Sequence, residues 1–245
     1  MFENQTEVTK KNGNNFLAVS ILISAVIVSG SIIYGIGAKA RNGNELASVA
    51  AGNGKTREKG NSLPTDTGNN AILGNPASPV IIVSYGDYQC PYCAQMFNTV
   101  EPLIRSEFIE KGIAQMVYRD FPLEAIHEFA RPSANAAECA GEQGKYWLYH
   151  DALFKRQASL GTLDFTELAK SLGLDDKTFA SCVTSQKYDS EIQKDYDAGV
   201  SLGVQGTPAT FINGKLLEGA LPWSAFKSAI EKAFEASKKD NKIGA

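Results

Sequence analysis

Residues 80–93 read VIIVSYGDYQCPYC, and the fold is decided in this stretch. Val80–Tyr85 is a short run rich in β-branched residues, which predicts a buried strand. Pro91 suits the first turn of a helix, so we expect a helix to begin there. Apolar residues at helical spacing support that helix, namely Phe97, Val100, Ile104 and Phe108. Cys90 and Cys93 therefore lie where a buried strand passes into a helix.

The next elements complete a βαβ unit. Pro102 falls inside the predicted helix and would remove a backbone hydrogen bond, so we expect a kink there. Gly112 ends the helix, and Ile113–Tyr118 reads as a second strand. Residues 124–203 then form a long stretch with helical patterns and no strand signal.

Strand signals return after Thr207-Pro208, in Ala209–Ile212. Asn213-Gly214 is a strong signal for a type I′ hairpin turn, from which Lys215–Glu218 should pair back. A final helix is expected after Pro222, with its apolar residues on one face. The order of elements predicts an α/β fold of the form βαβ, helical insertion, ββα.

The composition is that of an ordinary globular protein. The 245 residues carry a formal net charge of −3, whereas phosphate contacts would need a basic excess, so no nucleic-acid partner is predicted. Four cysteines are too sparse for a small disulfide-framework protein.

The N-terminal part predicts a membrane anchor. Residues 16–38 are apolar and uncharged, and about 34 Å of helix would cross a hydrocarbon core of roughly 30 Å. A cleavable signal is the alternative, because Ala38-Lys39-Ala40 has a small-x-small form. Residues 1–15 are assigned to the cytoplasm and residues 39–70, rich in Gly, Asn, Ser and Thr, to a flexible linker. Flanking lysines barely decide the orientation, so the extracytoplasmic placement of the folded part depends mainly on the cysteine chemistry.

The spacing of Cys90 and Cys93 predicts a redox-active pair. Three positions apart on the first turn, the two sulfurs are close enough to bond, with Cys90 at the exposed end. The free N–H groups and the positive dipole end there stabilise a thiolate at Cys90, which makes the disulfide readily reducible. An inert disulfide and half of a zinc site are the alternatives, but Cys139 and Cys182 are too far apart to supply the second zinc-binding pair. No metal is predicted, and no cofactor beyond the disulfide itself.

Four motifs in order carry a resemblance to a known family: Asp87–Cys93 (DYQCPYC), Arg119–Leu123 (RDFPL), Gly203–Pro208 (GVQGTP) and Phe211–Gly214 (FING). Together they resemble the DsbA-like thiol-disulfide oxidoreductases, particularly the membrane-anchored BdbD-type branch, over about residues 72–234. The resemblance implies a thioredoxin fold in residues 71–123 and 204–245, interrupted by a helical domain in residues 124–203.

The resemblance also implies roles for site residues. Cys90 would be the nucleophile that forms the mixed disulfide and Cys93 the resolving thiol, while a cis Thr207–Pro208 peptide would face the disulfide. Pro91 would stiffen the turn. Tyr92 stands where the best-known members have histidine and adds no positive charge beside Cys90. Both Tyr92 and the nearby Asp87 should therefore raise the pKa of the thiol relative to a histidine-containing motif.

Other candidate residues have less specific interpretations. Asp87 is expected to cap a strand end or to form a salt bridge, with a proton relay as the alternative. His127 could be a cap or could lie near the active cysteines. In an oxidising compartment we expect Cys139 and Cys182 to form a structural disulfide, with two free buried thiols as the alternative.

The sequence thus predicts an extracytoplasmic enzyme that passes the Cys90–Cys93 disulfide to secreted or membrane proteins with reduced cysteines. By family resemblance its reoxidant would be a membrane protein of the DsbB or VKOR type. A reductase or isomerase of the same fold is one alternative. A non-catalytic, membrane-tethered module that binds copper or peptides is another, although Met- or His-rich copper ligands are missing.

Overall fold

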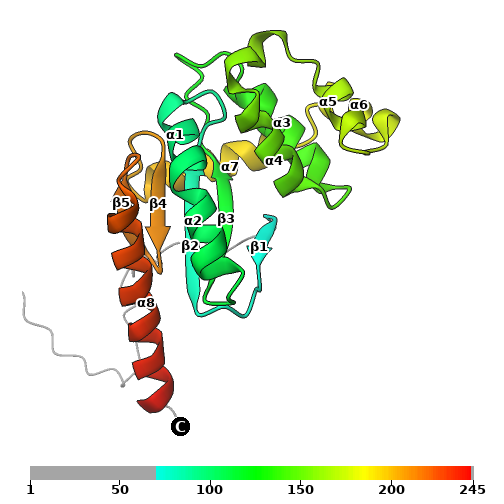
Figure 1. Ribbon diagram of the computed structural model, residues 1–245. Coiled ribbons are helices and arrows are strands. Elements are labelled where there is room, and N and C mark those ends of the chain that lie inside the picture. Colours follow the sequence, from blue (N-terminus) through cyan, green and yellow to red (C-terminus); the bar gives the residue numbers. More distant parts are fainter. Residues whose placement is uncertain (1–69, 244–245) are drawn as a thin grey trace, which may run out of the picture. The chain divides into compact units, whose positions relative to one another are not determined.

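The computed structural model describes residues 70–243 (Figure 1). The predicted N-terminus 1–15 and anchor 16–38 lie outside these residues, as does the linker but for its last residue. Within residues 70–243, no helix combines the length and hydropathy that a membrane crossing requires. The elements in chain order are β1 (Ile72–Gly74), β2 (Val80–Gly86), α1 (Pro91–Thr99), α2 (Glu101–Ile104), the π-helix η1 (Arg105–Ile109), β3 (Ala114–Asp120), α3 (Ala130–Gly141), α4 (Tyr146–Lys155), the 3-10 helix η2 (Gln157–Thr162), α5 (Phe165–Ser171), α6 (Asp176–Thr184), α7 (Asp189–Ser201), β4 (Ala209–Ile212), β5 (Lys215–Glu218) and α8 (Trp223–Ile243).

The five strands form one sheet in the order β1-β3-β2-β4-β5. β2 is central and pairs in parallel with β3, with Val83 opposite Val117, whereas its pairing with β4 is antiparallel. The βαβ unit and the terminal ββα unit thus meet at β2, as the sequence predicts. The short edge strand β1, antiparallel to β3, was not predicted.

Apolar residues on both faces of the sheet explain why β2 reads as a continuous hydrophobic run. On one face, Val80 and Ile82 pack against residues of α1, α2, η1 and α8, including Phe226 and Ile230. On the other face, Val83 and Tyr85 pack with residues of the β3–α3 connection, of α7, of the α7–β4 connection and of β4, namely Phe121, Tyr196, Val204, Ala209 and Phe211. β2 is therefore buried on both sides, and the loop that leaves it is held firmly at the edge of the core.

The helix after the cysteine pair is interrupted, as its proline predicts. α1 ends at Thr99 and α2 begins at Glu101, so the break falls at Val100 rather than at Pro102. Pro102 lies in the first turn of α2, where a missing N–H leaves no hydrogen bond unmade. This break turns Glu101 into the first residue of a new helix.

The hairpin between β4 and β5 has the predicted turn. Asn213 and Gly214 both have positive φ, 43° and 83°, as a type I′ turn requires. The Asn213 side chain also accepts a hydrogen bond from the Ile81 N–H at 2.6 Å, which attaches the hairpin to the start of β2.

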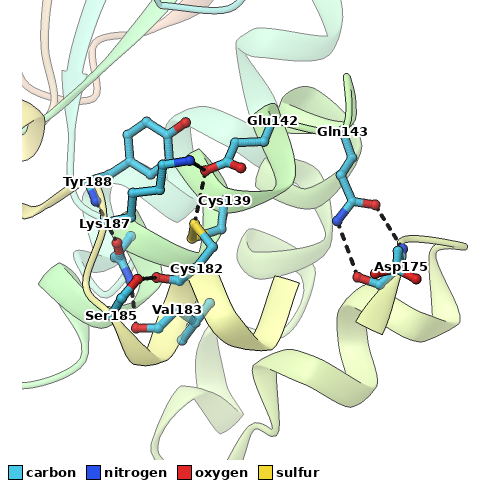
Figure 2. The surroundings of a disulfide bond; sticks show 10 residues. Cys139, Glu142, Gln143, Asp175, Cys182, Val183, Ser185, Lys187 and Tyr188 are labelled. Carbon is cyan, nitrogen blue, oxygen red and sulfur yellow. Dashed lines mark hydrogen bonds and ion pairs between the residues drawn. A yellow bond between two sulfur atoms is a disulfide. The ribbon is translucent and has the colours of Figure 1, made fainter. Parts of the chain in front are cut away.

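Residues 124–203 contain α3 to α7 and no strand, in agreement with the predicted helical stretch. The predicted disulfide between Cys139 of α3 and Cys182 of α6 is present, with an S–S distance of 2.03 Å. Figure 2 shows two further links between these helices and the segments beside them. Glu142 forms an ion pair with Lys187 at 2.8 Å, and Gln143 accepts a hydrogen bond from the Asp175 N–H at 2.8 Å.

Candidate active site

Cys90 is the N-cap residue of α1, with Pro91 in the first turn and Cys93 on the same turn. Both cysteines are free thiols in the structure, which therefore represents the reduced form. The expectation that Cys90 lies exposed is wrong, because only 3% of the residue is exposed, against 4% for Cys93. The reason is tertiary: the helical stretch packs over the pair in one apolar cluster that includes Phe154 and Leu160.

A residue far away in sequence also holds this junction. The side-chain amide of Gln157, in η2, donates hydrogen bonds to the carbonyl oxygens of Tyr88 at 2.8 Å and Cys90 at 2.9 Å. The sequence analysis did not identify Gln157, since a lone glutamine in a helical stretch carries no pattern. By contrast, Tyr92 is 62% exposed, so this side chain of the motif is available to a partner.

The two thiols have opposite acid–base character. The pKa of Cys90 is lowered to about 6, chiefly by a hydrogen bond from the Cys93 side chain. Burial opposes this shift, while the Thr207 side chain and the backbone N–H groups of Cys93 and Tyr92 lower the pKa further. Burial raises the pKa of Cys93 well above its ordinary value, and the neighbouring Cys90 adds a smaller increase. At neutral pH the pair therefore holds one thiolate, at Cys90, and one thiol, at Cys93.

The loop before β4 faces this pair. The Thr207–Pro208 peptide is cis, which is the isomer that the resemblance implied. The Cys90 Sγ lies 3.3 Å from the Thr207 carbonyl oxygen, to which the thiol form donates a hydrogen bond. The main chain of Thr207 thus lies beside the sulfur that attacks or is attacked, where a substrate segment can pair with it.

Asp87 caps the chain after β2, as one of its predicted roles requires, and its carboxylate contacts His127. One of its carboxylate oxygens accepts a hydrogen bond from the Gln89 N–H at 2.7 Å. The other accepts the Leu123 N–H at 2.9 Å and lies 2.7 Å from His127 Nδ1. The fully buried carboxylate of Asp87 therefore joins the loop before Cys90 to the segment after β3. His127 belongs to this segment and lies against Asp87.

A polar cluster that the sequence analysis missed lies next to α1. Glu101, His150 and Asp151 bring one potential ligand atom each within 4.8 Å of one another. However, Arg105 donates hydrogen bonds to both carboxylates, with its Nη2 2.7 Å from Asp151 Oδ1. The guanidinium supplies the positive charge that a metal ion would bring, so the chemistry of this set fits an ion-pair network.

Comparisons with known proteins bear directly on this geometry. A family model described as Thioredoxin matches residues 66–232. The chain belongs to the thioredoxin family. In this thioredoxin-family chain, the strand-to-helix junction with its cysteine pair and the facing cis-proline loop form the candidate active site.

Individual relatives show which members of the thioredoxin family the chain resembles. Over 232 residues the chain is 27% identical to a probable disulfide bond formation protein D of Bacillus anthracis, which covers 91% of this chain and 98% of the relative. A crystal structure of oxidised BdbD from Bacillus subtilis has a TM-score of 0.61 at 26% identity, over 68% of this chain and 93% of that chain. The predicted resemblance to DsbA-like thiol-disulfide oxidoreductases and the thioredoxin-like α/β fold are thereby confirmed.

Other relatives are much longer proteins. The chain is 33% identical over 176 residues to the Na(+)/H(+) antiporter NhaA 3 of Salinispora tropica, covering 72% of this chain but 26% of the antiporter. The chain thus spans about a quarter of the length of these curated relatives, so their transport activity is not carried over to it.

Proposed function

We propose that this protein is an extracytoplasmic thiol-disulfide oxidoreductase that transfers the Cys90–Cys93 disulfide to other proteins. The observation that carries the proposal is the asymmetry of the pair. A thiolate with a pKa of about 6 is a good leaving group, which makes the disulfide easily reduced and hence oxidising. Because burial raises the pKa of Cys93, this sulfur stays a protonated thiol after the first exchange and attacks the mixed disulfide poorly, which leaves the mixed disulfide to the second thiol of the substrate.

The reaction consists of two exchange steps. A substrate thiolate attacks the Cys90 sulfur, the Cys90–Cys93 bond breaks, and Cys93 leaves and takes up a proton. The second thiolate of the substrate then attacks the substrate sulfur of the mixed disulfide, and Cys90 leaves as the stabilised thiolate. Two electrons pass from the substrate thiols to the enzyme pair, and the substrate gains one disulfide.

Location and partners are part of the proposal. We assign residues 16–38 to a membrane anchor and the catalytic part to the extracytoplasmic side, and the disulfide between Cys139 and Cys182 supports this, since structural disulfides persist in oxidising compartments. The substrates would be secreted or membrane proteins with reduced cysteines. Each turnover leaves Cys90 and Cys93 reduced, so an oxidant must restore the disulfide, and we propose a membrane protein of the DsbB or VKOR type for this role.

A reductase or isomerase remains the second candidate, because the same exchange steps run in either direction. The equilibrium of the cysteine pair with glutathione separates the two. We expect a potential well above that of thioredoxin, about −270 mV, and toward that of DsbA, about −120 mV. A potential near the thioredoxin value would reverse the proposed direction of electron flow.

Substitution of the exposed Tyr92 provides a graded version of this experiment. Tyr92→His places a partly positive ring beside the Cys90 thiolate, so the pKa of Cys90 should fall below about 6. The dithiol form is then stabilised, and the potential should rise by about 30 mV for each 1.4 kcal/mol gained. Tyr92→Phe, which adds no charge, is the control, and an equal shift in both variants would show that charge at this position has no effect.

A further inference from the structure

Gln157 lies between two buried apolar residues of the helical stretch. It is the first residue of η2, and α4 ends two positions before it. Phe154, three positions earlier, is buried, and its ring stacks on that of Phe97 in α1 with the centroids 5.0 Å apart. Leu160, three positions later, is also buried and belongs to the same apolar cluster as the cysteine pair. The main chain of Gln157 is therefore fixed on both sides, and its amide reaches the active site from a defined position.

The Gln157 amide binds the two carbonyl groups on either side of Gln89. Its Nε2 donates to the carbonyl oxygens of Tyr88 at 2.8 Å and Cys90 at 2.9 Å, which lie 69 and 67 positions away in the sequence. An amide –NH₂ group has two hydrogens, so both donors are used here. Tyr88 is buried, and loss of a hydrogen bond to a buried carbonyl is costly. The two bonds thus attach the main chain just before α1 to the helical stretch.

The main chain of Cys90 determines where its sulfur lies. Cys90 has extended backbone angles, φ −69° and ψ 123°, and its side chain makes no capping hydrogen bond. Its N–H donates to the Asp87 carbonyl at 3.1 Å, and its own carbonyl accepts the Ala94 N–H at 3.1 Å besides the Gln157 amide. The angle ψ turns the carbonyl relative to the side chain of the same residue. A bond that fixes the Cys90 carbonyl therefore also fixes the direction of the Cys90 sulfur.

Stabilisation of the Cys90 thiolate depends on this direction. The backbone N–H groups of Tyr92 and Cys93, on the first turn of α1, lower the pKa of Cys90. Hydrogen bonds weaken steeply when their angle departs from the preferred range. A rotation about ψ of Cys90 would turn the sulfur away from both N–H groups, and the Gln157 amide restricts that rotation from outside the helix.

We propose that Gln157 is a positioning residue for thiol-disulfide exchange, which holds the carbonyl oxygens of Tyr88 and Cys90 so that the Cys90 sulfur faces the N-terminus of α1. This inference rests on the proposed function and extends it to the helical stretch. The thioredoxin part of the chain supplies both sulfurs and the helix, and the helical stretch supplies the contact that keeps them aligned. Gln157 exchanges no proton or electron with the substrate, because it acts through Cys90.

Gln157→Met tests this role, because it removes both N–H donors and keeps a side chain of similar length. The first measurement is the rate at which iodoacetamide alkylates Cys90 in the reduced full chain, followed against pH. We expect the midpoint to rise by about one pH unit, because the thiolate is less well aligned with its donors. In a glutathione buffer at about pH 8, the equilibrium should move toward the disulfide by on the order of 10-fold, because the reduced form has lost that stabilisation.

Gln143 offers the matched control. It is a glutamine of the same helical stretch whose amide also binds main chain, accepting the Asp175 N–H at 2.8 Å and donating to the Asp175 carbonyl at 3.3 Å. Gln143→Met should leave both the pH midpoint and the glutathione equilibrium at their wild-type values. Gln157→Lys keeps N–H donors and adds a positive charge, so its midpoint should lie at or below that of the wild type. Gln157 is partly exposed, so either side chain can be accommodated there.

Three results would overturn the role of Gln157. One is an unchanged midpoint in Gln157→Met, and another is an equal rise in Gln157→Met and Gln143→Met, which would indicate a general loosening of the helical stretch. The third is a rise in Gln157→Lys as large as that in Gln157→Met, which would show that the N–H donors have no effect. The proposed function fails separately, if the wild-type protein itself has a midpoint near that of an unperturbed thiol.

Discussion

Cys90→Ala is expected to abolish the oxidation of a reduced, unfolded protein, with the rate falling to that of buffer alone. The reason is that Cys93 alone cannot form the Cys90–Cys93 disulfide, so the variant has no active-site disulfide for a substrate thiolate to attack. The measurement is the appearance of disulfides in the substrate, followed by mass after alkylation.

Cys93→Ala should give a different result, because it leaves Cys90 reactive and removes the resolving thiol. Incubation with oxidised substrate should then accumulate a mixed disulfide at Cys90, visible on a non-reducing gel and lost on reduction. Cys90→Ala should form none under the same conditions. Substrate oxidation at the wild-type rate by the Cys90→Ala protein would contradict the exchange mechanism.

The second large effect is on stability. Cys139→Ala/Cys182→Ala opens the link that joins α3 to α6 across 43 positions of sequence. In the chain-entropy model this closure contributes at most about 4 kcal/mol to the free energy of unfolding. We therefore expect a fall of a few kcal/mol in that free energy, measured by urea unfolding, and an increased slope because the unfolded chain becomes less compact.

The active-site pair must be held constant in this measurement. Both proteins should carry Cys90→Ala/Cys93→Ala, so that the second disulfide is the difference between them. An unchanged unfolding midpoint would show that this disulfide does not hold the helical stretch together. The remaining links between the same segments, from Glu142 to Lys187 and from Gln143 to Asp175, would then be sufficient.

Much of the fold follows from local sequence signals. β4 and β5 have the predicted bounds, because the Asn213-Gly214 turn determines where each strand ends. β2 and β3 are each predicted to within two residues, since β2 begins with a run of β-branched residues and β3 carries Met116, Val117 and Tyr118 in sequence. β1 was missed because three residues, Ile72–Gly74, are too few for any periodic pattern.

The site was predicted less completely than the fold. The CxxC spacing indicated which sulfurs react. The structure adds their unequal pKa values: a hydrogen bond from Cys93 lowers the pKa of Cys90, and burial raises that of Cys93. The burial of Cys90 arises from residues more than sixty positions away, so no local pattern predicts it. The burial of Glu101 was likewise not predicted, because a glutamate at the start of a helix is usually exposed and its neighbours His150 and Asp151 lie far along the chain.

The central claim is that Cys90 is a thiolate at neutral pH, and the rate of its alkylation measured against pH tests this claim most directly. In the reduced wild-type protein, iodoacetamide should react at a rate that rises with a midpoint near pH 6 and is level from about pH 7 upward, because the pKa of Cys90 is lowered to about 6. Peptide mapping would assign the label to Cys90. A midpoint near pH 9, as in an unperturbed thiol, would contradict the account.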